Sequence, residues 1–584
     1  MDLRLSVLIF FLTQLTFACV TKHKYESSTS QQRIDSSTCQ LPQERYRWSK
    51  SNYPQLIWIS IDSMNLSGLQ EIVSSLRQPH PKGFKWLLES KNRNTNLIIR
   101  EPTITASSHI STLTCSSAGK HGIFANSQWD GSRTVSGFST PFELETFATS
   151  LQRSGLKVVT AAYPALDGSE SGRQVSEGFT YGESLSKSHL YSDVKDQEII
   201  HSWSDKNGKS IEILKISDGD PSKIENFLCG INSCIIEHSG IPYITNVTFS
   251  FNGRTARAYV QSIQGVKNKI YISQLYLNNS FPVSTKLKQE SCGLIFSPGK
   301  ENHLGEHGAE HWIRGLQHRL SYFDQNWARY LPTTNADVLF LYLEDIDSIR
   351  HQYAGDNSAK QIISEHYERV DRVVGEFIAS LPSSTNFVIL GDHGMSTVKK
   401  EINIRRILPE KILLNYQIIT SGGTVLFYHN KFQSSEVSAK PSDSEMSNLV
   451  EAKKNILNFR LSEKDKPIFE KVLIKTTKEM QDSGLNHKNA PFMIAIANED
   501  FSLQNSVAIE LILSDVVNKS GPNPRPRGQH GHAQESEKMK AFLVGWGPKI
   551  DRISLKNIKT NIDLVPAIGN AFGWRVPPQC AGSR

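Results

Sequence analysis

The stretch Gln55–Ile61, QLIWISI, is a near-continuous apolar run that is directly followed by Asp62. Such a run is typical of a strand that is buried on both faces, as in a parallel sheet. A second run, Asp337–Leu343, is followed by Asp347. A third, Asn386–Leu390, is followed by Asp392. These repeated segments predict one largely parallel sheet with carboxylates at the carboxyl ends of its strands, where such sheets bind ligands.

Helical segments are expected between these strands. Phe142–Ser154 has a helical pattern and precedes a further strand at Lys157–Ala162. Longer helices are expected at Glu310–Tyr330 and at Ala359–Leu381, the second of which has apolar residues at helical spacing. The recurrent alternation of strands and helices predicts an α/β core in which helices flank both faces of the sheet.

Residues 201–299 break this alternation. Four segments there alternate apolar and polar residues: Ser210–Ile216, Tyr243–Phe251, Ala256–Ile263 and Lys269–Leu277. This pattern predicts a small antiparallel β subdomain inserted into the core. The core is then expected in two parts, residues 51–200 and residues 300–584.

Length and charge exclude some classes of protein. The 584 residues are too many for one small core, and 38% of them are hydrophobic. The 65 basic and 58 acidic residues nearly cancel, which leaves a net charge of +7. Because no long run of lysine and arginine occurs, no nucleic acid polymer is expected as a partner. The pattern of residues does not indicate an oligomeric state.

The N-terminus has the form of an export signal. Residues 1–18 contain Arg4 and the apolar stretch Leu5–Leu12, which is too short to span a membrane. Cys19 follows Leu-Thr-Phe-Ala, a sequence that resembles a permissive bacterial lipobox. A lipid on Cys19 would tether the mature chain to a membrane. The alternative is ordinary cleavage beside an incidental cysteine. Residues 19–50 are expected to form a polar linker. We therefore expect an exported chain, as a periplasmic or cell-surface lipoprotein or, alternatively, as a secreted protein.

Export would permit disulfide bonds. Cys229 and Cys234 enclose a short turn and are candidates for a local bridge. The pairing of the remaining cysteines cannot be read from their spacing. They are Cys39, Cys115, Cys292 and Cys580.

The stretch Glu101–Asn126, EPTITASSHISTLTCSSAGKHGIFAN, is dense in hydroxyl groups. Serine and threonine gather where they cap the first backbone N–H groups of a helix, so a polar helix start is one interpretation. The alternative is a functional site. The second interpretation is supported by the Asp and His residues that follow predicted strands elsewhere in the chain.

Six carboxylate and imidazole side chains lie at or after predicted strand ends or in a glycine-rich turn: Asp62, Asp347, His351, Asp392, His393 and His530. Asp347 and His351 are four positions apart, so they share one side of a helical turn. Any one of the six alone is more often a surface carboxylate or a hydrogen-bonded core histidine. Together they form a set of nitrogen and oxygen donors of the kind that binds Zn²⁺.

Five motifs occur in a family-specific order. They are the strand-borne Asp62, PTxTxxxH…HGxxxN within residues 102–126, D-x-x-x-H from Asp347 to His351, GDHGM around Asp392, and GxHG around His530. In this order they resemble the nucleotide pyrophosphatase/phosphodiesterase family of the alkaline phosphatase superfamily, over about residues 53–580. The resemblance implies an alkaline-phosphatase-like α/β core and a hydrolase that acts on phosphoric ester bonds.

The resemblance also implies two Zn²⁺ ions per chain. One would be held by Asp347, His351 and His530, and the other by Asp62, Asp392, His393 and the hydroxyl of Thr105. Two such metals can clamp the attacking and leaving oxygens of a displacement at phosphorus. Thr105 would attack the phosphorus and form a phospho-threonine, which water activated at the second zinc would release.

Three further residues are assigned by the resemblance. Asn126 lies 21 positions after Thr105 (126 − 105), the family's spacing for an amide that binds a phosphoryl oxygen; a turn asparagine is the alternative. Tyr342 and Tyr163 match substrate-binding positions. In relatives that cleave nucleotides an aromatic residue follows the nucleophile, whereas Ala106 stands here, which weakens the case for a nucleotide.

No Lys-x-Arg motif of the kind that threonine-using monoesterases place in their active site is found, which favours diesters. We therefore expect an exported phosphodiesterase or pyrophosphatase whose substrate is a small-molecule or lipid phosphodiester. Two alternatives stay open. One is a phosphomonoesterase or phosphonate hydrolase with the same metals, and the other is a non-catalytic surface binding protein, which would be expected to lack one or more ligands.

Overall fold

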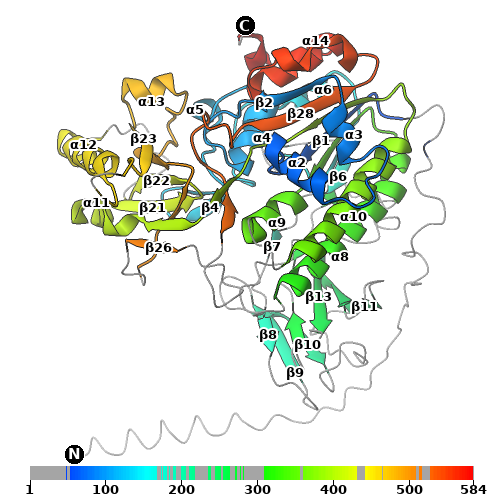
Figure 1. Cartoon of the computed structure of the whole chain (residues 1–584), viewed down its shortest axis with the longest axis horizontal. Helices are drawn as coiled ribbons and strands as arrows, with labels where there is room; N and C mark the ends of the chain where they lie inside the picture. The colour runs from blue at the N-terminus through cyan, green and yellow to red at the C-terminus, as the bar shows by residue number, and fades with distance from the viewer. Residues whose placement is uncertain are drawn as a thin grey trace, which may run out of the picture. The chain divides into compact units, whose positions relative to one another are not determined.

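The structure of the chain is a computed structural model (Figure 1). It describes residues 48, 53–166, 173, 175, 177–179, 183–184, 189–191, 199–204, 210–216, 234–238, 244–251, 254–262, 270–272, 276–277, 280–281, 308–354, 359–430, 441–462, 465–507, 512–515 and 526–582. All of them belong to one compact unit, Thr38–Arg584. The expected signal peptide, Cys19 and most of the expected linker lie outside the described residues.

A central sheet of eight described strands organises the core. In spatial order the strands are β16 (Ser280–Phe281), β6 (Glu177–Phe179), β5 (Val158–Ala161), β17 (Val338–Leu343), β1 (Leu56–Ile61), β18 (Asn386–Leu390), β28 (Ala541–Trp546) and β2 (Arg93–Leu97). The five strands from β6 to β18 are parallel, and β16, at one edge, and β28 run antiparallel to their neighbours. The largely parallel sheet confirms the predicted fold class.

Both faces of the sheet are buried, as the apolar run of β1 predicted. Ile57, Ile59 and Ile61 pack into one hydrophobic cluster, whereas Leu56 and Trp58 pack into another. Successive side chains of a strand point to opposite faces, so a strand between two helical layers must be apolar at every position. This requirement explains why the run has no polar alternation.

Helices cover the two faces. The cluster on the Ile57 face includes residues of α2 (Leu66–Ser75), α3 (Phe84–Glu89), α8 (Gly308–Arg329) and α10 (Lys360–Ala379). The cluster on the Leu56 face includes residues of α4 (Thr105–Thr114), α6 (Phe147–Arg153) and α14 (Leu564–Phe572). The expected helices at Phe142–Ser154, Glu310–Tyr330 and Ala359–Leu381 therefore correspond to α6, α8 and α10.

The predicted antiparallel subdomain consists of short sheets. Its described strands are β7 (Glu183–Ser184), β8 (His189–Tyr191), β9 (Ile199–Ser204), β10 (Ser210–Ile216), β11 (Cys234–His238), β12 (Ile244–Phe251), β13 (Arg254–Ser262), β14 (Ile270–Ile272) and β15 (Tyr276–Leu277). The expected segment Lys269–Leu277 contains two strands, β14 and β15. Because β7 and β8 pair with β15 and β14, the group of strands begins before residue 201, the boundary expected from the sequence.

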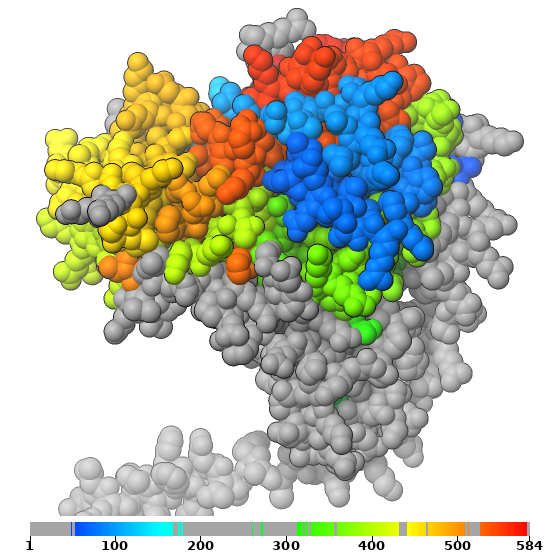
Figure 2. All heavy atoms as spheres, viewed as in Figure 1, coloured from blue at the N-terminus to red at the C-terminus, as the bar shows by residue number. Residues whose placement is uncertain are grey.

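Part of the chain expected to belong to the core forms further sheets that have a hydrophobic cluster of their own. We call the described residues between 400 and 515 the second lobe; in Figure 2 it is coloured from yellow-green to light orange. Its sheets contain β20 (Lys400–Asn403), β21 (Tyr416–Ser421), β22 (Thr424–His429), β23 (Phe469–Ile474), β24 (Met493–Ala497), β25 (Phe501–Gln504) and β26 (Leu513–Asp515). With α11 (Glu410–Asn415) and α12 (Asp443–Asn458) they enclose a separate hydrophobic cluster.

A disulfide joins Cys115, the residue that ends α4, to Cys580 near the end of the chain. Spacing alone had left this pairing open. Cys580 lies in a short 3₁₀ segment, Pro578–Gly582, so the bond attaches the C-terminal segment to the helix that begins with Thr105. The candidate bridge between Cys229 and Cys234 lies outside the residues whose side chains are described. None of the described helices has the length and apolar character needed to cross a membrane.

Candidate active site

The carboxyl ends of three adjacent central strands supply most of the candidate site. Asp62 directly follows β1, which lies between β17 and β18. Asp347 lies in α9 (Asp345–Tyr353), the helix that follows β17. Asp392 follows β18 after a single glycine. Parallel neighbours end at the same edge of a sheet, so residues hundreds of positions apart come together there.

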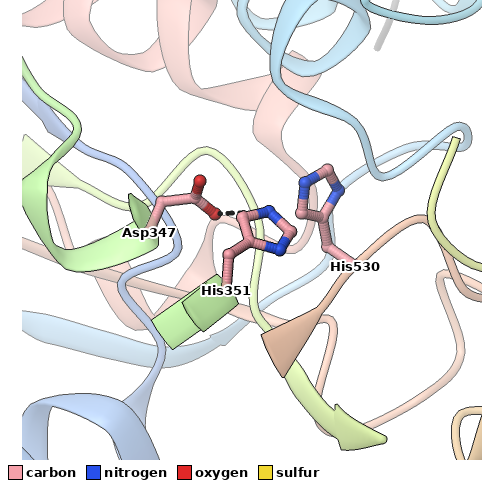
Figure 3. Close-up of side chains that lie close together, drawn as sticks. All are labelled: Asp347, His351 and His530. Carbon is pink, nitrogen blue, oxygen red and sulfur yellow. Dashed lines mark ion pairs between the residues drawn. The ribbon is translucent and has the colours of Figure 1, made fainter. Parts of the chain in front are cut away.

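One group of side chains consists of Asp347, His351 and His530 (Figure 3). Their donor atoms lie within 4.8 Å of one another, and Asp347 Oδ1 is 3.4 Å from His351 Nε2. Asp347 and His351 are one helical turn apart in α9, whereas His530 comes from the turn after β27 (Arg527–Gln529). The structure thus brings together the three residues expected to hold one metal.

The second group consists of Asp62, Asp392 and His393, and all three are buried. His393 Nε2 lies 3.5 Å from Asp62 Oδ1 and 3.3 Å from Asp392 Oδ2. The rings of His393 and His530 stack with their centroids 4.0 Å apart, so the two groups adjoin. The residues expected to hold the other metal are therefore also together.

The three candidate histidine ligands have the same type of hydrogen-bond partner at Nδ1. Each places Nδ1 within hydrogen-bond distance of a backbone carbonyl: His351 of Gly528 O at 2.9 Å, His530 of Thr103 O at 3.2 Å, and His393 of Gly394 O at 3.1 Å. A proton on Nδ1 leaves the lone pair of the imidazole on Nε2, the arrangement common in metal-bound histidines.

Two carboxylate oxygens of the second group have no hydrogen-bond partner among the described residues. Asp62 Oδ1 and Asp392 Oδ2 are buried and accept no hydrogen bond from the described residues. Burial raises the pKa of Asp62 well above its usual range, and the charges of Asp347 and Asp392 raise it further. Burial likewise raises the pKa of Asp392, although His109 opposes the shift. A bound cation would compensate the charge of buried carboxylates that crowd one another and would displace their protons. Both groups therefore fit a divalent metal ion with nitrogen and oxygen ligands.

In the first group the pKa of the carboxyl is lowered, not raised. Burial raises the pKa of Asp347, but His351, His530 and His393 outweigh burial and lower it to about 2. Burial also lowers the pKa of His530 to about 3 and that of His393 to about 4. At neutral pH this group therefore offers an ionised Asp347 and a neutral His530, the protonation states that metal binding requires.

Thr105 is the first residue of α4, and every residue of this helix is buried. Its hydroxyl oxygen lies 3.2 Å from His393 Nε2, at the edge of the second group. The backbone N–H groups of a first helical turn have no partner within the helix and attract anions. The hydroxyl is thus placed between a candidate metal position and a helix terminus that favours phosphate.

Asn126 is held beside the nucleophile candidate. Its Oδ1 accepts a hydrogen bond of 2.9 Å from the backbone N–H of Ala106, the residue after Thr105. Because Oδ1 is occupied in this way, the amide orientation is set and Nδ2 remains as the donor. A neutral donor next to Thr105 matches the role expected for Asn126, which stays a prediction.

Ser63 is a part of the site that the sequence did not reveal. Its hydroxyl donates to Asp347 Oδ1 at 2.5 Å, and its backbone N–H donates to Asp392 Oδ1 at 3.1 Å. Ser63 therefore contacts both groups of candidate ligands. It has a φ of 57°, a left-handed conformation that serine seldom adopts. The only signal in the sequence is its place directly after Asp62.

A family model for type I phosphodiesterase/nucleotide pyrophosphatase matches residues 56–532 of the chain. The chain belongs to this family. It is accordingly a phosphodiesterase, a hydrolase that acts on phosphoric esters, and the family's metal dependence agrees with the two groups of candidate ligands. The resemblance inferred from the five motifs is confirmed.

Solved structures of ectonucleotide pyrophosphatase/phosphodiesterase 5 are similar to the chain. The murine protein is 12% identical with a TM-score of 0.48, and an inactive form in complex with AMP gives the same values. The human protein is 13% identical with a TM-score of 0.47. In each case the similarity covers 90% of this chain and 96% of the other. No curated protein matches the chain.

The two tyrosines expected to bind substrate have partners inside the protein. The hydroxyl of Tyr342 donates to Asp62 Oδ2, and the hydroxyl of Tyr163 accepts a hydrogen bond of 2.9 Å from Trp58 Nε1. Both rings meet His109 edge to face, and both tyrosines are only 2% exposed. Tyr342 thereby supports a candidate metal ligand, and a contact of either tyrosine with substrate stays a prediction.

Proposed function

We propose that the chain is a two-zinc phosphodiesterase that works through a covalent phospho-threonine. The observation that carries the proposal is the placement of the Thr105 hydroxyl 3.2 Å from His393 Nε2, at the start of α4 and beside the second group. A hydroxyl needs activation before it can attack phosphorus, and a metal ion held by the second group would supply it. Zinc ions held by the two groups would supply positive charge that lowers the pKa of a hydroxyl and neutralises a phosphoryl oxygen.

The chain's own residues account for the remaining steps. Attack by Thr105 Oγ1 forms a bond to phosphorus and breaks the bond to the leaving alcohol, which takes up the proton. Attack by water then breaks the bond to Oγ1, restores the hydroxyl and releases a phosphomonoester. Throughout, Nδ2 of Asn126 and the first turn of α4 face the charge on the phosphoryl oxygens. The net reaction consumes one water and releases one alcohol.

We further propose that the chain is exported and that its substrate is a small-molecule or lipid phosphodiester. Export is supported by the N-terminal pattern and by the disulfide between Cys115 and Cys580, because such bonds persist in oxidising compartments. The substrate class is supported by the family and by the position of the only Lys-x-Arg triplet. This triplet, Lys91-Asn92-Arg93, precedes Thr105, and Arg93 donates to the carbonyl of Ser90 at 3.2 Å. A lipid tether on Cys19 is part of the same proposal.

The substrate class is tested with an aryl phosphodiester beside the matching aryl phosphomonoester, at equal concentrations and saturating zinc. We expect kcat/KM for the diester to exceed that for the monoester by at least about 10-fold, which corresponds to about 1.4 kcal/mol of transition-state stabilisation. A preference for the monoester would reject the diester proposal and leave the fold and the ligand groups unchanged. Turnover of neither compound would favour a binding protein.

Replacing Asn126 tests the proposed donor to the phosphoryl oxygen. Asn126→Ala is expected to lower kcat for the diester by about 100- to 1,000-fold, because a preorganised donor to developing charge is lost. Asn96→Ala, which removes an exposed amide from β2, is the matched control and should leave kcat unchanged. Steady-state kinetics measures both variants. A value for Asn126→Ala within about twofold of the wild type would assign Asn126 to the turn alone.

A further inference from the structure

The turn that carries His530 is held by the second lobe. The backbone N–H of Gly423 donates to the carbonyl of His530 at 2.8 Å, and the hydroxyl of Thr424 donates to the carbonyl of Gly531 at 2.5 Å. One position further, His532 Nε2 lies 2.9 Å from the carbonyl of Phe501 in β25. Three successive residues of the turn thus have hydrogen-bond partners in the second lobe.

The same turn is held from the other side by the segment that leads into α4. Thr103 O accepts from the backbone N–H of Gly531 at 3.0 Å and lies 3.2 Å from His530 Nδ1. The hydroxyl of Thr103 donates to the carbonyl of His532 at 2.8 Å. Because Thr103 is two residues before Thr105, one network of hydrogen bonds fixes both a candidate ligand and the candidate nucleophile.

Glycine permits the close approach of the two turns. Gly422 has a φ of 65°, and a Cβ added there would lie 2.0 Å from the carbonyl oxygen of His530. Gly531 has a φ of 80°, and a Cβ added there would lie 2.6 Å from the carbonyl oxygen of Ser421. A side chain at either position would clash at these distances. Because both residues are glycine, the backbone of the β21–β22 turn can contact the backbone of the His530 turn.

We propose that the turn Ser421–Thr424 of the second lobe is a positioning device that orients His530 toward the metal of the first group. The inference rests on the proposed function, since it assigns these residues a role toward a metal ion. Hydrogen bonds that orient a metal-binding histidine affect metal affinity even though they do not touch the metal. Thr424 is the residue of this turn whose side chain takes part, so its hydroxyl can be removed without changing the backbone.

The test compares Thr424→Val with Thr420→Val in the full chain. Valine keeps the shape of threonine and its preference for strands, but it leaves the carbonyl of Gly531 without this donor. Thr420 lies on β21 of the same hairpin, opposite Val425, and takes no part in these hydrogen bonds. Zinc is removed with a chelator, and Zn²⁺ alone is then titrated by calorimetry.

We expect the wild type to bind zinc in two steps. In Thr424→Val the Kd of one step should rise by about 10-fold, while the other step stays unchanged. Thr424→Ser, which restores the hydroxyl, should return the wild-type value, and Thr420→Val should bind as the wild type does. Added zinc should also recover kcat in Thr424→Val.

Two outcomes overturn the inference and are distinguishable. If the wild type binds two zinc ions and Thr424→Val binds them with equal affinity, the positioning role is rejected and the proposed function stands. If the wild type binds no zinc, the proposed function fails and the inference fails with it. Should Thr424→Val not fold, Thr103→Val removes the hydrogen bond on the other side of the turn, and the same weakening of one binding step is expected.

Discussion

Thr105→Ala is expected to lower kcat for a phosphodiester by about 10,000-fold or more, because it removes the oxygen that forms the bond to phosphorus. Thr105→Ser keeps a hydroxyl at the first position of α4 and should retain activity within about 100-fold. Steady-state kinetics with an aryl phosphodiester measures both. Thr105 is buried next to His393, so the missing hydroxyl is not readily replaced by another side chain.

A matched control separates chemistry from folding. Thr112 lies on the same buried helix, and its hydroxyl bonds the carbonyl of Ser108. Thr112→Ala therefore removes a threonine hydroxyl from the same helix. It should lower the free energy of unfolding by about 1 kcal/mol and leave kcat unchanged.

Trapping gives a second measurement of the same prediction. Acid quenching during turnover of a diester labelled at phosphorus should leave label on the wild type and on Thr105→Ser, but none on Thr105→Ala. Label that persists on Thr105→Ala would place the covalent step on another residue, and a fully active alanine variant would exclude the threonine mechanism.

Removal of metal is expected to abolish activity, and addition of zinc is expected to restore it. The reason lies in the two groups of ligands, because Asp62 and Asp392 have buried oxygens without a hydrogen-bond partner among the described residues, and a bound cation would compensate their charge. Zinc at 100 times its Kd should stabilise the folded chain by about 2.7 kcal/mol, which raises the melting temperature of the chelated protein. Activity assays and thermal melts with and without zinc measure both effects.

Zinc affinity should also fall as the pH is lowered. Burial raises the pKa of Asp62 and of Asp392, so these carboxyls hold protons at a higher pH than usual and must release them when a cation binds. Below about pH 4, protonation of His393 adds to the loss. Binding should therefore release protons, which calorimetry in buffers of different ionisation enthalpy detects.

The control for this prediction is a buried carboxylate elsewhere. Asp371 accepts hydrogen bonds from the backbone N–H groups of His80 and Phe84, and Asp371→Asn should lower stability while zinc binding persists. Asp392→Asn should weaken zinc binding. Equal affinity in both variants, or activity that survives complete removal of metal, would refute the metal requirement.

The sequence revealed most of the core because its signals are local. β18 has the expected bounds, Asn386–Leu390, and β1 differs from its expected run by one residue. Five of the six candidate ligands came together because they follow β1, β17 or β18, which end at one edge of the central sheet. His530 instead follows β27, which pairs with β19 outside that sheet. Asp347 and His351 lie together because they are four positions apart in one helix, α9.

Other features depend on tertiary contacts that leave no local pattern. In the second lobe β20 pairs with β25 and β22 pairs with β24, in each case a strand many residues further along the chain, so its region was expected to be core. Ser63 gains its importance from a left-handed backbone and from two aspartates more than 280 positions away. The orientation of Tyr342 toward Asp62, instead of toward open space, likewise requires the packed structure.

The disulfide between Cys115 and Cys580 turns most of the chain into a covalent ring, since the two residues are 465 positions apart. Asn126 and five of the six candidate ligands lie inside the ring, whereas Asp62 and Thr105 lie on the tail that precedes it. A single protease cut anywhere between the two cysteines opens the ring without releasing a fragment. The part of the chain that carries the nucleophile then stays bonded to the part that carries His530, for as long as the surroundings remain oxidising.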